Sequence, residues 1–299
     1  MSNEMSFITV GLNPTLQKTL LLPRVRAGRV NRCGECRFDA AGKALNMCRV
    51  LTQLGKKCVH LTQLGGSLRP IYLDLCKKDG LDIRWAESNS AIRFCYTIIG
   101  KDKRQVTELV EEGEAAGEGA QAGLLEALDR LLPDASVLII GGSKTAGFSD
   151  SLIPEMVSMA KKRGLFVIMD TRGPDLINSL PYRPDIIKPN LEEFACAFAA
   201  GKKLSKKQAA SLCREIWKQH GCSIVLTRGA QNIWYSQTGT LEEFPVQAVD
   251  PINSTGSGDA FTAGLAAALN DGASFRAALA EGSHCGRQNA LLLQPGSIV

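Results

Sequence analysis

The chain has 299 residues, of which 44% are hydrophobic and 22% charged, as in an ordinary soluble globular protein with a sizeable core. Its formal net charge of +5 is mild, and Lys and Arg are scattered among acidic residues, so nucleic-acid binding is not indicated. No apolar run approaches the roughly 20 residues that span a bilayer, and the first residues lack the pattern of an export signal, so we expect a cytoplasmic protein with no membrane partner.

Short β-rich runs alternate with helical patterns along most of the chain. In the first part, the patterns predict strands at residues 7–12 and 58–64, and helices at about 44–54 and ending near residue 79. Later they predict strands at 136–142, 165–170, 185–190 and 223–229, with helices at about 149–163 and 205–220. This alternation is typical of an α/β protein whose mostly parallel sheet carries helices on both faces.

Two regions, residues 15–38 and 92–109, contain strand-like pieces without intervening helices. They predict a small antiparallel sheet that projects from the main body as a lid. Within the first region, Cys33 and Cys36 form a close pair in the segment CGEC. No second pair or nearby His completes a zinc set, so this pair alone does not indicate a metal site.

Polar residues and glycines follow several of the predicted strands directly. These strand ends are Gly141-Gly142-Ser143, Asp170-Thr171, Lys188-Pro189-Asn190 and Thr227-Arg228-Gly229. Ligands of open α/β sheets bind beyond the carboxyl ends of the strands. The sequence therefore predicts a site at this edge of the sheet.

The segment NSTGSGDAFTAG, residues 253–264, places a glycine-rich turn before a helical pattern. Gly256, Ser257 and Gly258 fall on the first, unpaired N–H groups of that helix, which can bind an anion such as a phosphate. Asp259 would then lie beside the anion as a general base in phosphoryl transfer. Gly, Ser and Asp are also common at helix starts, so this segment alone favours a plain helix start.

The segment NSTGSGDAF resembles the carboxy-terminal signature of the PfkB (ribokinase-like) carbohydrate kinases. Other segments are similar, in chain order, to the phosphofructokinase and tagatose-6-phosphate kinase branch of that family: GLNPTLQKTL, AAGKALNMCRVLTQLG, LIIGGS, MDTRG, IKPNLEE, LTRGA and GRQNALLLQPG. The resemblance implies one domain over residues 1–299, folded as a ribokinase-like three-layer αβα sandwich with a mostly parallel central sheet and a small antiparallel β lid. It also implies a homodimer formed through the lid.

The resemblance implies roles for individual residues. Asp259 would be the catalytic base, and Gly256, Ser257 and Gly258 would form the anion hole. Asn190 and Glu193 would place hydrated Mg²⁺, although Asn190 is equally typical of a helix cap. The remaining nucleotide contacts would be Thr227, Gly229 and, near the adenine, Asn289. The sugar phosphate would be bound by Gln17, Gly42, Lys43, Asn46, Arg93 and Lys144.

The sequence departs from the family where the sugar would bind. Gln17 stands where an Asp is usual, so one acceptor and two donors replace a carboxylate. Ala41 and Ala44 add methyl groups beside Gly42 and Lys43. In TELVEEGE, the residues Val110, Glu112 and Glu114 replace the usual Asn and prolines.

Three functions remain open from the sequence. The first is ATP- and Mg²⁺-dependent phosphorylation of a ketohexose phosphate such as fructose 1-phosphate, fructose 6-phosphate or tagatose 6-phosphate. The second is a kinase of the same fold that acts on an unphosphorylated sugar or a nucleoside. The third is a regulator that binds ligand without turnover. Asp259 and the neighbouring glycines favour an enzyme.

Overall fold

The computed structural model describes residues 6–102 and 105–299. In these residues the larger of two sheets has nine strands. Residues 1–5 and 103–104 lie outside the described residues, and the latter two belong to the region 92–109 that was expected to form part of the lid. Across the sheet the order is β13-β12-β11-β10-β9-β8-β1-β4-β5. The strands are β1 (Ser6–Gly11), β4 (Cys58–Gly65), β5 (Asp82–Ala91), β8 (Ala135–Gly141), β9 (Phe166–Asp170), β10 (Ile186–Ile187), β11 (Ser223–Arg228), β12 (Gln231–Ser236) and β13 (Glu242–Phe244).

Neighbouring strands of this sheet are parallel from β5 to β11, while β12 and β13 pair antiparallel at one edge. The parallel strands are apolar on both faces. In β8, Val137 and Ile139 pack into one core, and Leu138 and Ile140 pack into the other. This double burial explains why these strands form nearly continuous apolar runs in the sequence.

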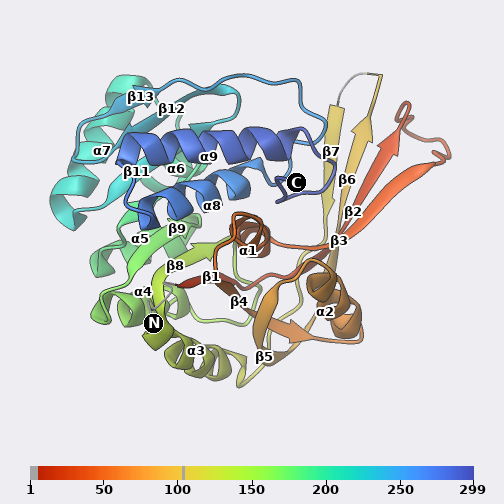
Figure 1. The fold of residues 1–299 in the computed structure, drawn as a ribbon, viewed down its shortest axis with the longest axis horizontal. Helices are drawn as coiled ribbons and strands as arrows, with labels where there is room; N and C mark the ends of the chain where they lie inside the picture. The colour runs from red at the N-terminus through yellow and green to blue at the C-terminus, as the bar shows by residue number, and fades with distance from the viewer. Residues whose placement is uncertain (1–5, 103–104) are drawn as a thin grey trace.

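Helices cover both faces of the sheet and complete three layers (Figure 1). One face carries α1 (Lys43–Gln53), α2 (Arg69–Lys78), α8 (Ser257–Asn270) and α9 (Phe275–Ala290). The other carries α3 (Ala120–Leu131), α4 (Leu152–Lys162), α5 (Gly173–Ser179), α6 (Leu191–Phe198) and α7 (Lys206–His220). The expected ribokinase-like α/β fold, with helices on both faces of a mostly parallel sheet, is confirmed.

The lid is a second sheet of four strands that projects from the carboxyl edge of the large one (Figure 1). Its strands are β2 (Thr15–Leu22), β3 (Glu35–Ala41), β6 (Arg93–Gly100) and β7 (Gln105–Val110), in the order β3-β2-β6-β7. The outer pairs are antiparallel as expected, while β2 and β6 run parallel in the middle. That parallel pair arises because β2 and β6 leave the large sheet in the same direction, after β1 and after β5.

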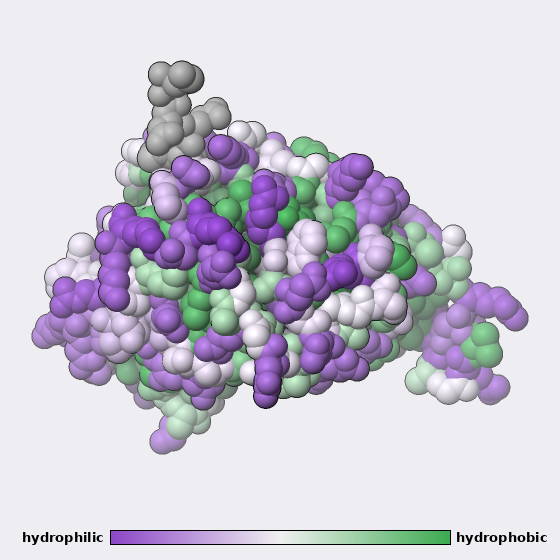
Figure 2. All heavy atoms as spheres, turned by 90° about the horizontal axis from the view of Figure 1, so that it is seen from below, coloured by the Kyte–Doolittle hydropathy of each residue, from purple (hydrophilic) through white to green (hydrophobic). Residues whose placement is uncertain are grey.

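The surface is mixed in polarity. Figure 2 shows hydrophilic side chains interspersed with hydrophobic ones on the face seen from below, and the lid tip standing away from the body. Among the helices of the described ranges, none has the length and apolar character that a membrane span requires.

Candidate active site

The glycine-rich loop before α8 is held rigidly against the last residues of the chain. Gly256 has φ 85°, and a Cβ atom there would lie 2.3 Å from the backbone nitrogen of Gly296. The buried Asn289 Nδ2 donates hydrogen bonds to Thr255 O (2.9 Å) and Ser257 Oγ (3.0 Å). This anion loop, residues 255–258, therefore presents the start of α8 in one fixed conformation.

Asp259 follows the anion loop in the first turn of α8, and it is 5% exposed and lines a cavity. Its Oδ2 accepts a hydrogen bond from Asn46 Nδ2 at 2.8 Å. Asn46 Oδ1 in turn accepts one from Nη1 of the buried Arg49 at 3.2 Å, and Arg49 Nη1 also donates to Pro295 O. A chain of buried polar contacts thus fixes the orientation of the carboxylate.

Burial raises the pKa of Asp259 to about 6, because the charged form loses hydration. The Lys43 ammonium acts in the opposite direction, and Asp170 adds to the increase. At neutral pH the carboxylate is ionised, yet it is a stronger base than an exposed aspartate. A group of this kind can accept a proton from a hydroxyl beside it.

Asp170 lies at the end of β9 and joins two lysines. Its Oδ1 is 2.8 Å from Lys43 Nζ, and its Oδ2 is 2.9 Å from Nζ of Lys188, which is 3% exposed. Thr262 Oγ1 donates to the same Oδ2. Although burial opposes ionisation, the two ammonium groups outweigh it and lower the pKa of Asp170 to about 2. This cluster carries two positive charges and one negative charge.

The pKa of Lys43 is raised above its ordinary range. Burial alone would lower it, but the carboxylates of Asp170, Asp259 and Glu193 have the larger combined effect. The ammonium of Lys43, expected to bind a sugar phosphate, thus already has Asp170 of the protein as a partner.

Three cavities adjoin one another at this edge of the sheet. The central cavity, about 440 Å³, is lined by Asp259, Lys188 and the lid residue Gln17. The apolar cavity, about 320 Å³, shares Thr227 and Gly258 with it. The cationic cavity, also about 320 Å³ and named here for Lys43, Arg93 and Arg172, shares Lys43 and Arg93 with it; the carboxylates of Glu108, Asp170 and Glu193 line it as well. Volumes of this size are typical of small-molecule sites.

The apolar cavity contains the expected nucleotide contacts Thr227 and Gly229, together with Ser257 and Gly258 of the anion loop. Its walls include Ile233, Val246 and Phe261, which suit a flat, uncharged ring. Asn289 does not line this cavity; it is buried beneath the anion loop and bonded to it. Any effect of Asn289 on a nucleotide would therefore act through the loop.

Asn190 and Glu193 line the central cavity and also cap α6. Asn190 Oδ1 accepts from Glu193 N at 2.8 Å, and Glu193 Oε2 accepts from Asn190 N at 2.9 Å. The position of Asn190 is thus compatible both with capping a helix and with placing hydrated Mg²⁺. Within residues 6–102 and 105–299, no group of three or more His, Cys, Asp or Glu side chains is arranged to hold a metal ion directly.

The residues expected to contact the sugar phosphate lie in two of the three cavities, except for Lys144. Gly42, Lys43 and Arg93 line both the central and the cationic cavities, and Asn46 lines the central one. Gln17 also lines the central cavity, with Nε2 donating to Thr97 Oγ1 at 2.8 Å.

The ammonium of Lys144 is occupied by partners within the protein. Its ammonium pairs with Asp150 and Asp175, and it lines none of the three cavities. Its position therefore gives no support to a contact with the sugar phosphate. Proximity to the strand end at Gly141-Gly142 suggested that contact in the sequence, but the side chain is used to tie neighbouring segments together.

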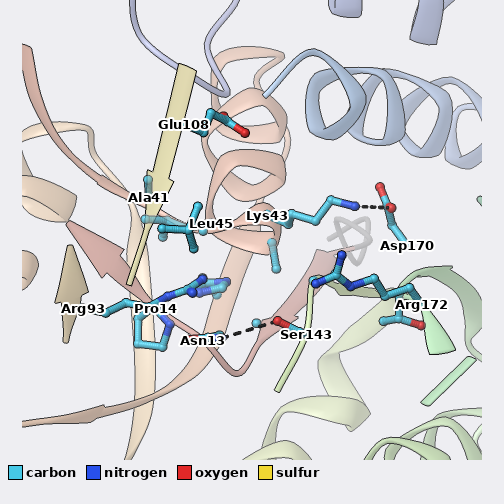
Figure 3. Close-up of a pocket in the computed structure, with 18 of the residues that line it drawn as sticks. Asn13, Pro14, Ala41, Lys43, Leu45, Arg93, Glu108, Ser143, Asp170 and Arg172 are labelled. Atoms are coloured by element: carbon cyan, nitrogen blue, oxygen red, sulfur yellow. Dashed lines mark hydrogen bonds and ion pairs between the residues drawn. The ribbon is translucent and has the colours of Figure 1, made fainter. Parts of the chain in front are cut away.

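Several residues of the site were not assigned a role from the sequence. They include Lys188 and Asp170, which belong to the polar strand ends, and Arg172 and Ser143, which line the cationic cavity (Figure 3). The signal for them was the rule that ligands bind at the carboxyl edge of such sheets. That rule identifies the strand ends without saying which of their side chains point into a cavity.

The chain is similar to known proteins in sequence and in fold. Residues 16–296 match the pfkB family of carbohydrate kinases. Phosphofructokinase-2 from Escherichia coli in complex with fructose-6-phosphate is similar in structure, with a TM-score of 0.85, 19% sequence identity, and coverage of 96% of this chain and 94% of that one.

Two structures from Thermotoga maritima are also similar. One, named a possible 1-phosphofructokinase, has a TM-score of 0.87, 20% identity, and coverage of 97% of this chain and 93% of that one. A ribokinase has a TM-score of 0.74, 18% identity, and coverage of 99% and 96%. At these identities the structural similarity concerns the fold.

Proposed function

Because this chain belongs to the pfkB family of carbohydrate kinases, we propose that it transfers the terminal phosphoryl group of ATP to a hydroxyl of a sugar phosphate. The observation that carries this proposal is the position of Asp259. Its carboxylate lines the central cavity directly after the anion loop, and Gly258 of that loop borders both the central and the apolar cavities. A nucleotide in the apolar cavity would thus direct its phosphates toward Asp259.

In this mechanism the reaction is a direct displacement. Asp259 takes the proton of the acceptor hydroxyl, and the hydroxyl oxygen forms a bond to the terminal phosphorus of ATP. The bond from that phosphorus to the bridging oxygen breaks, and ADP leaves. The N–H groups at the start of α8 and the ammonium groups of Lys43 and Lys188 stabilise the charge on the transferring group.

Mg²⁺ fits this site as a hydrated ion. Asn190 and Glu193 border the central cavity, and beyond their capping bonds a second lone pair of Asn190 Oδ1 and the Oε1 of Glu193 can accept hydrogen bonds from water. They would hold the ion through water, since one carboxylate is too few for direct coordination by the protein. The ion would neutralise phosphate charge when it is bound.

A panel of acceptors tests the proposal. ADP formation is followed with fructose 1-phosphate, fructose 6-phosphate, tagatose 6-phosphate, the free sugars and nucleosides, with Asp259→Asn as the inactive control. We expect turnover to be fastest with one of the sugar phosphates. Turnover confined to free sugars or nucleosides would contradict the phosphorylated acceptor. ATP binding without turnover of any acceptor would contradict the kinase.

We also propose that two copies pair through the outer face of the lid. Gln17 and Glu108 line the central cavity, so the neighbouring positions along these strands face away from it. Leu109 and Phe38 occupy such positions and are 53% and 36% exposed. Sedimentation should then show a dimer that Leu109→Glu dissociates, whereas a monomeric parent chain would exclude this interface.

A further inference from the structure

The cationic cavity has two arginines on opposite walls. Arg93 comes from the first residue of β6 in the lid, and Arg172 precedes α5 at the end of β9 (Figure 3). Ser143, after β8, lies between them, and its hydroxyl accepts a hydrogen bond from Asn13 Nδ2 at 3.4 Å. Three separate segments of the chain thus bring polar groups to one small space.

These arginines differ from the lysines of the site in how their charge is balanced. Lys43 and Lys188 both contact Asp170. Arg93 donates to the backbone oxygen of Glu111, while its buried Nε has no partner. Within the described ranges, the guanidinium of Arg172 has neither a hydrogen bond nor an ion pair. Two guanidinium groups without a carboxylate partner therefore face one cavity.

The three carboxylates that line this cavity have other partners: Asp170 pairs with two lysines, Glu193 caps α6, and Glu108 accepts a hydrogen bond from Thr255. The guanidinium of Arg172 therefore keeps its N–H donors for an anion that enters the cavity. Guanidinium groups bind oxyanions through paired N–H donors, and they match phosphate especially well. The hydroxyl of Ser143 adds a further donor to the same space.

The position of this cavity determines which part of a ligand it would bind. It shares Gly42, Lys43 and Arg93 with the central cavity but shares no lining residue with the apolar cavity. A molecule that extends from Asp259 through the central cavity would reach Arg172 with its far end. An anion at that end would belong to the acceptor, because the apolar cavity accommodates the nucleotide separately.

We propose that Arg172 is a specificity-determining residue that binds the phosphate group of the acceptor together with Arg93. This inference rests on the proposed kinase function and deepens it. The acceptor would carry its reacting hydroxyl at one end and its phosphate at the other. Arg172 would select for that phosphate and take no part in the chemical step.

Steady-state kinetics of Arg172→Ala and Arg172→Lys test this assignment. The matched control is Arg214→Ala, which removes an exposed arginine of α7 that lines none of the three cavities. We expect Arg172→Ala to raise KM for the phosphorylated acceptor by about tenfold to a hundredfold, with kcat changed less than about threefold. Arg172→Lys should restore part of the loss, since it keeps the charge but not the fork of donors. Equal KM values in Arg172→Ala and Arg214→Ala would overturn the proposal.

A binding measurement separates this inference from the kinase function. Inorganic phosphate is titrated without nucleotide, and the shift of the thermal unfolding midpoint is recorded. Arg172→Ala should need at least about fivefold more phosphate than the parent chain for half of the shift, and Arg214→Ala should match the parent. The proposal for Arg172 fails if all three proteins respond alike. If the parent phosphorylates no acceptor, the kinase proposal fails while the phosphate titration still decides the function of Arg172.

Discussion

At the Asp259 end of the site, the groups that contact the carboxylate are themselves held by buried partners. At the Arg172 end, two guanidinium groups line a cavity without forming an ion pair with any of its carboxylates. Asn46 is held by Arg49, and the anion loop is held by Asn289. Arg93 comes from the lid, and Arg172 comes from a strand end. One end is fixed in a rigid core, and the other depends on exposed side chains.

On the proposed function, this difference would separate the chemical step from the selection of the acceptor. A proton-transfer site needs a fixed carboxylate and fixed N–H groups, so residues around it would tolerate few substitutions. A pocket lined by the exposed Arg172 and the half-buried Arg93 could change its preference by single substitutions without disturbing the core. The departures at Gln17, Ala41 and Ala44 also lie on the acceptor side, while the residues of the anion loop keep the family pattern.

Removing the base should have the largest effect on turnover. Asp259→Asn keeps the size of the side chain and can still accept the hydrogen bond from Asn46, but it cannot take up a proton. We expect kcat to fall by about a hundredfold to ten-thousandfold with little change in nucleotide affinity. Steady-state kinetics and nucleotide titration measure the two quantities. Near-normal turnover would show that Asp259 is not the base, and the Asp259 end could then no longer be distinguished from the Arg172 end by a chemical role.

Rigidity of the anion loop is tested by Gly256→Ala. The positive φ at Gly256 and the 2.3 Å approach to Gly296 should together lower the free energy of unfolding by more than about 3 kcal/mol. Gly80→Ala is the control, because Gly80 has φ 70° with no atom within 4 Å of the added Cβ, and should lose about 1 kcal/mol. Urea unfolding compares the two variants. Equal losses would show that the loop can move and is not held as tightly as its contacts indicate.

The fold could be predicted from the sequence wherever burial leaves a strong pattern. Strands β1, β8, β9 and β11 are apolar on both faces, so they were recognised without ambiguity. Strand β5 was not predicted, because it lies at the sheet edge and many of its residues are exposed. The parallel pairing of β2 with β6 was also missed, since pairing between distant segments leaves no local signal.

The chemical end of the site was easier to locate from the sequence than the acceptor end. The glycines, Ser257 and Asp259 are adjacent in the chain, so one short segment suggested an anion loop, and the resemblance of that segment to the family supported it. Arg172 and Arg93 are far apart in sequence and meet only through the fold. Lys144 is a different case: it lies near a strand end, and its ammonium pairs with Asp150 and Asp175, so its contact with a sugar phosphate stays a prediction.

The free energy of unfolding should depend on pH because the Asp259 carboxylate is buried. Burial raises the pKa of Asp259 from 3.8 to about 6, so the folded state loses stability as pH rises through this window and keeps the loss above it. A shift of about two pKa units corresponds to about 3 kcal/mol. Asp259→Asn avoids this loss, and we expect it to be more stable than the parent by up to about 3 kcal/mol at pH 8 but not at about pH 4.

Urea unfolding at the two pH values measures this difference. The control is Asp129→Asn, which changes an exposed aspartate of α3 that pairs with Arg163. Its effect should stay below about 1 kcal/mol at both pH values. If Asp259→Asn gave the same stability change at pH 4 and pH 8, the carboxylate would not be held in a desolvated state.

The smallest expected effect concerns Glu108, which links the two regions. This lid residue borders both the central and the cationic cavities, and its Oε1 accepts a hydrogen bond from Thr255 Oγ1 of the anion loop at 2.9 Å. Glu108→Gln can keep that bond while removing a negative charge from the space where an acceptor phosphate would bind. We expect KM for a phosphorylated acceptor to fall by about twofold to fivefold, because exposed charges interact weakly through water.

Whether Glu108→Gln changes KM or kcat will show whether Glu108 affects acceptor binding alone. Glu112→Gln is the control, because it removes an exposed carboxylate that lines none of the three cavities. A lower KM with unchanged kcat would place Glu108 with Arg172 and Arg93 as a residue that adjusts acceptor affinity. If kcat changed instead, the contact with Thr255 would transmit the position of the lid to the anion loop. The chemical end would then depend on the lid, and the separation of chemistry from selection would no longer hold.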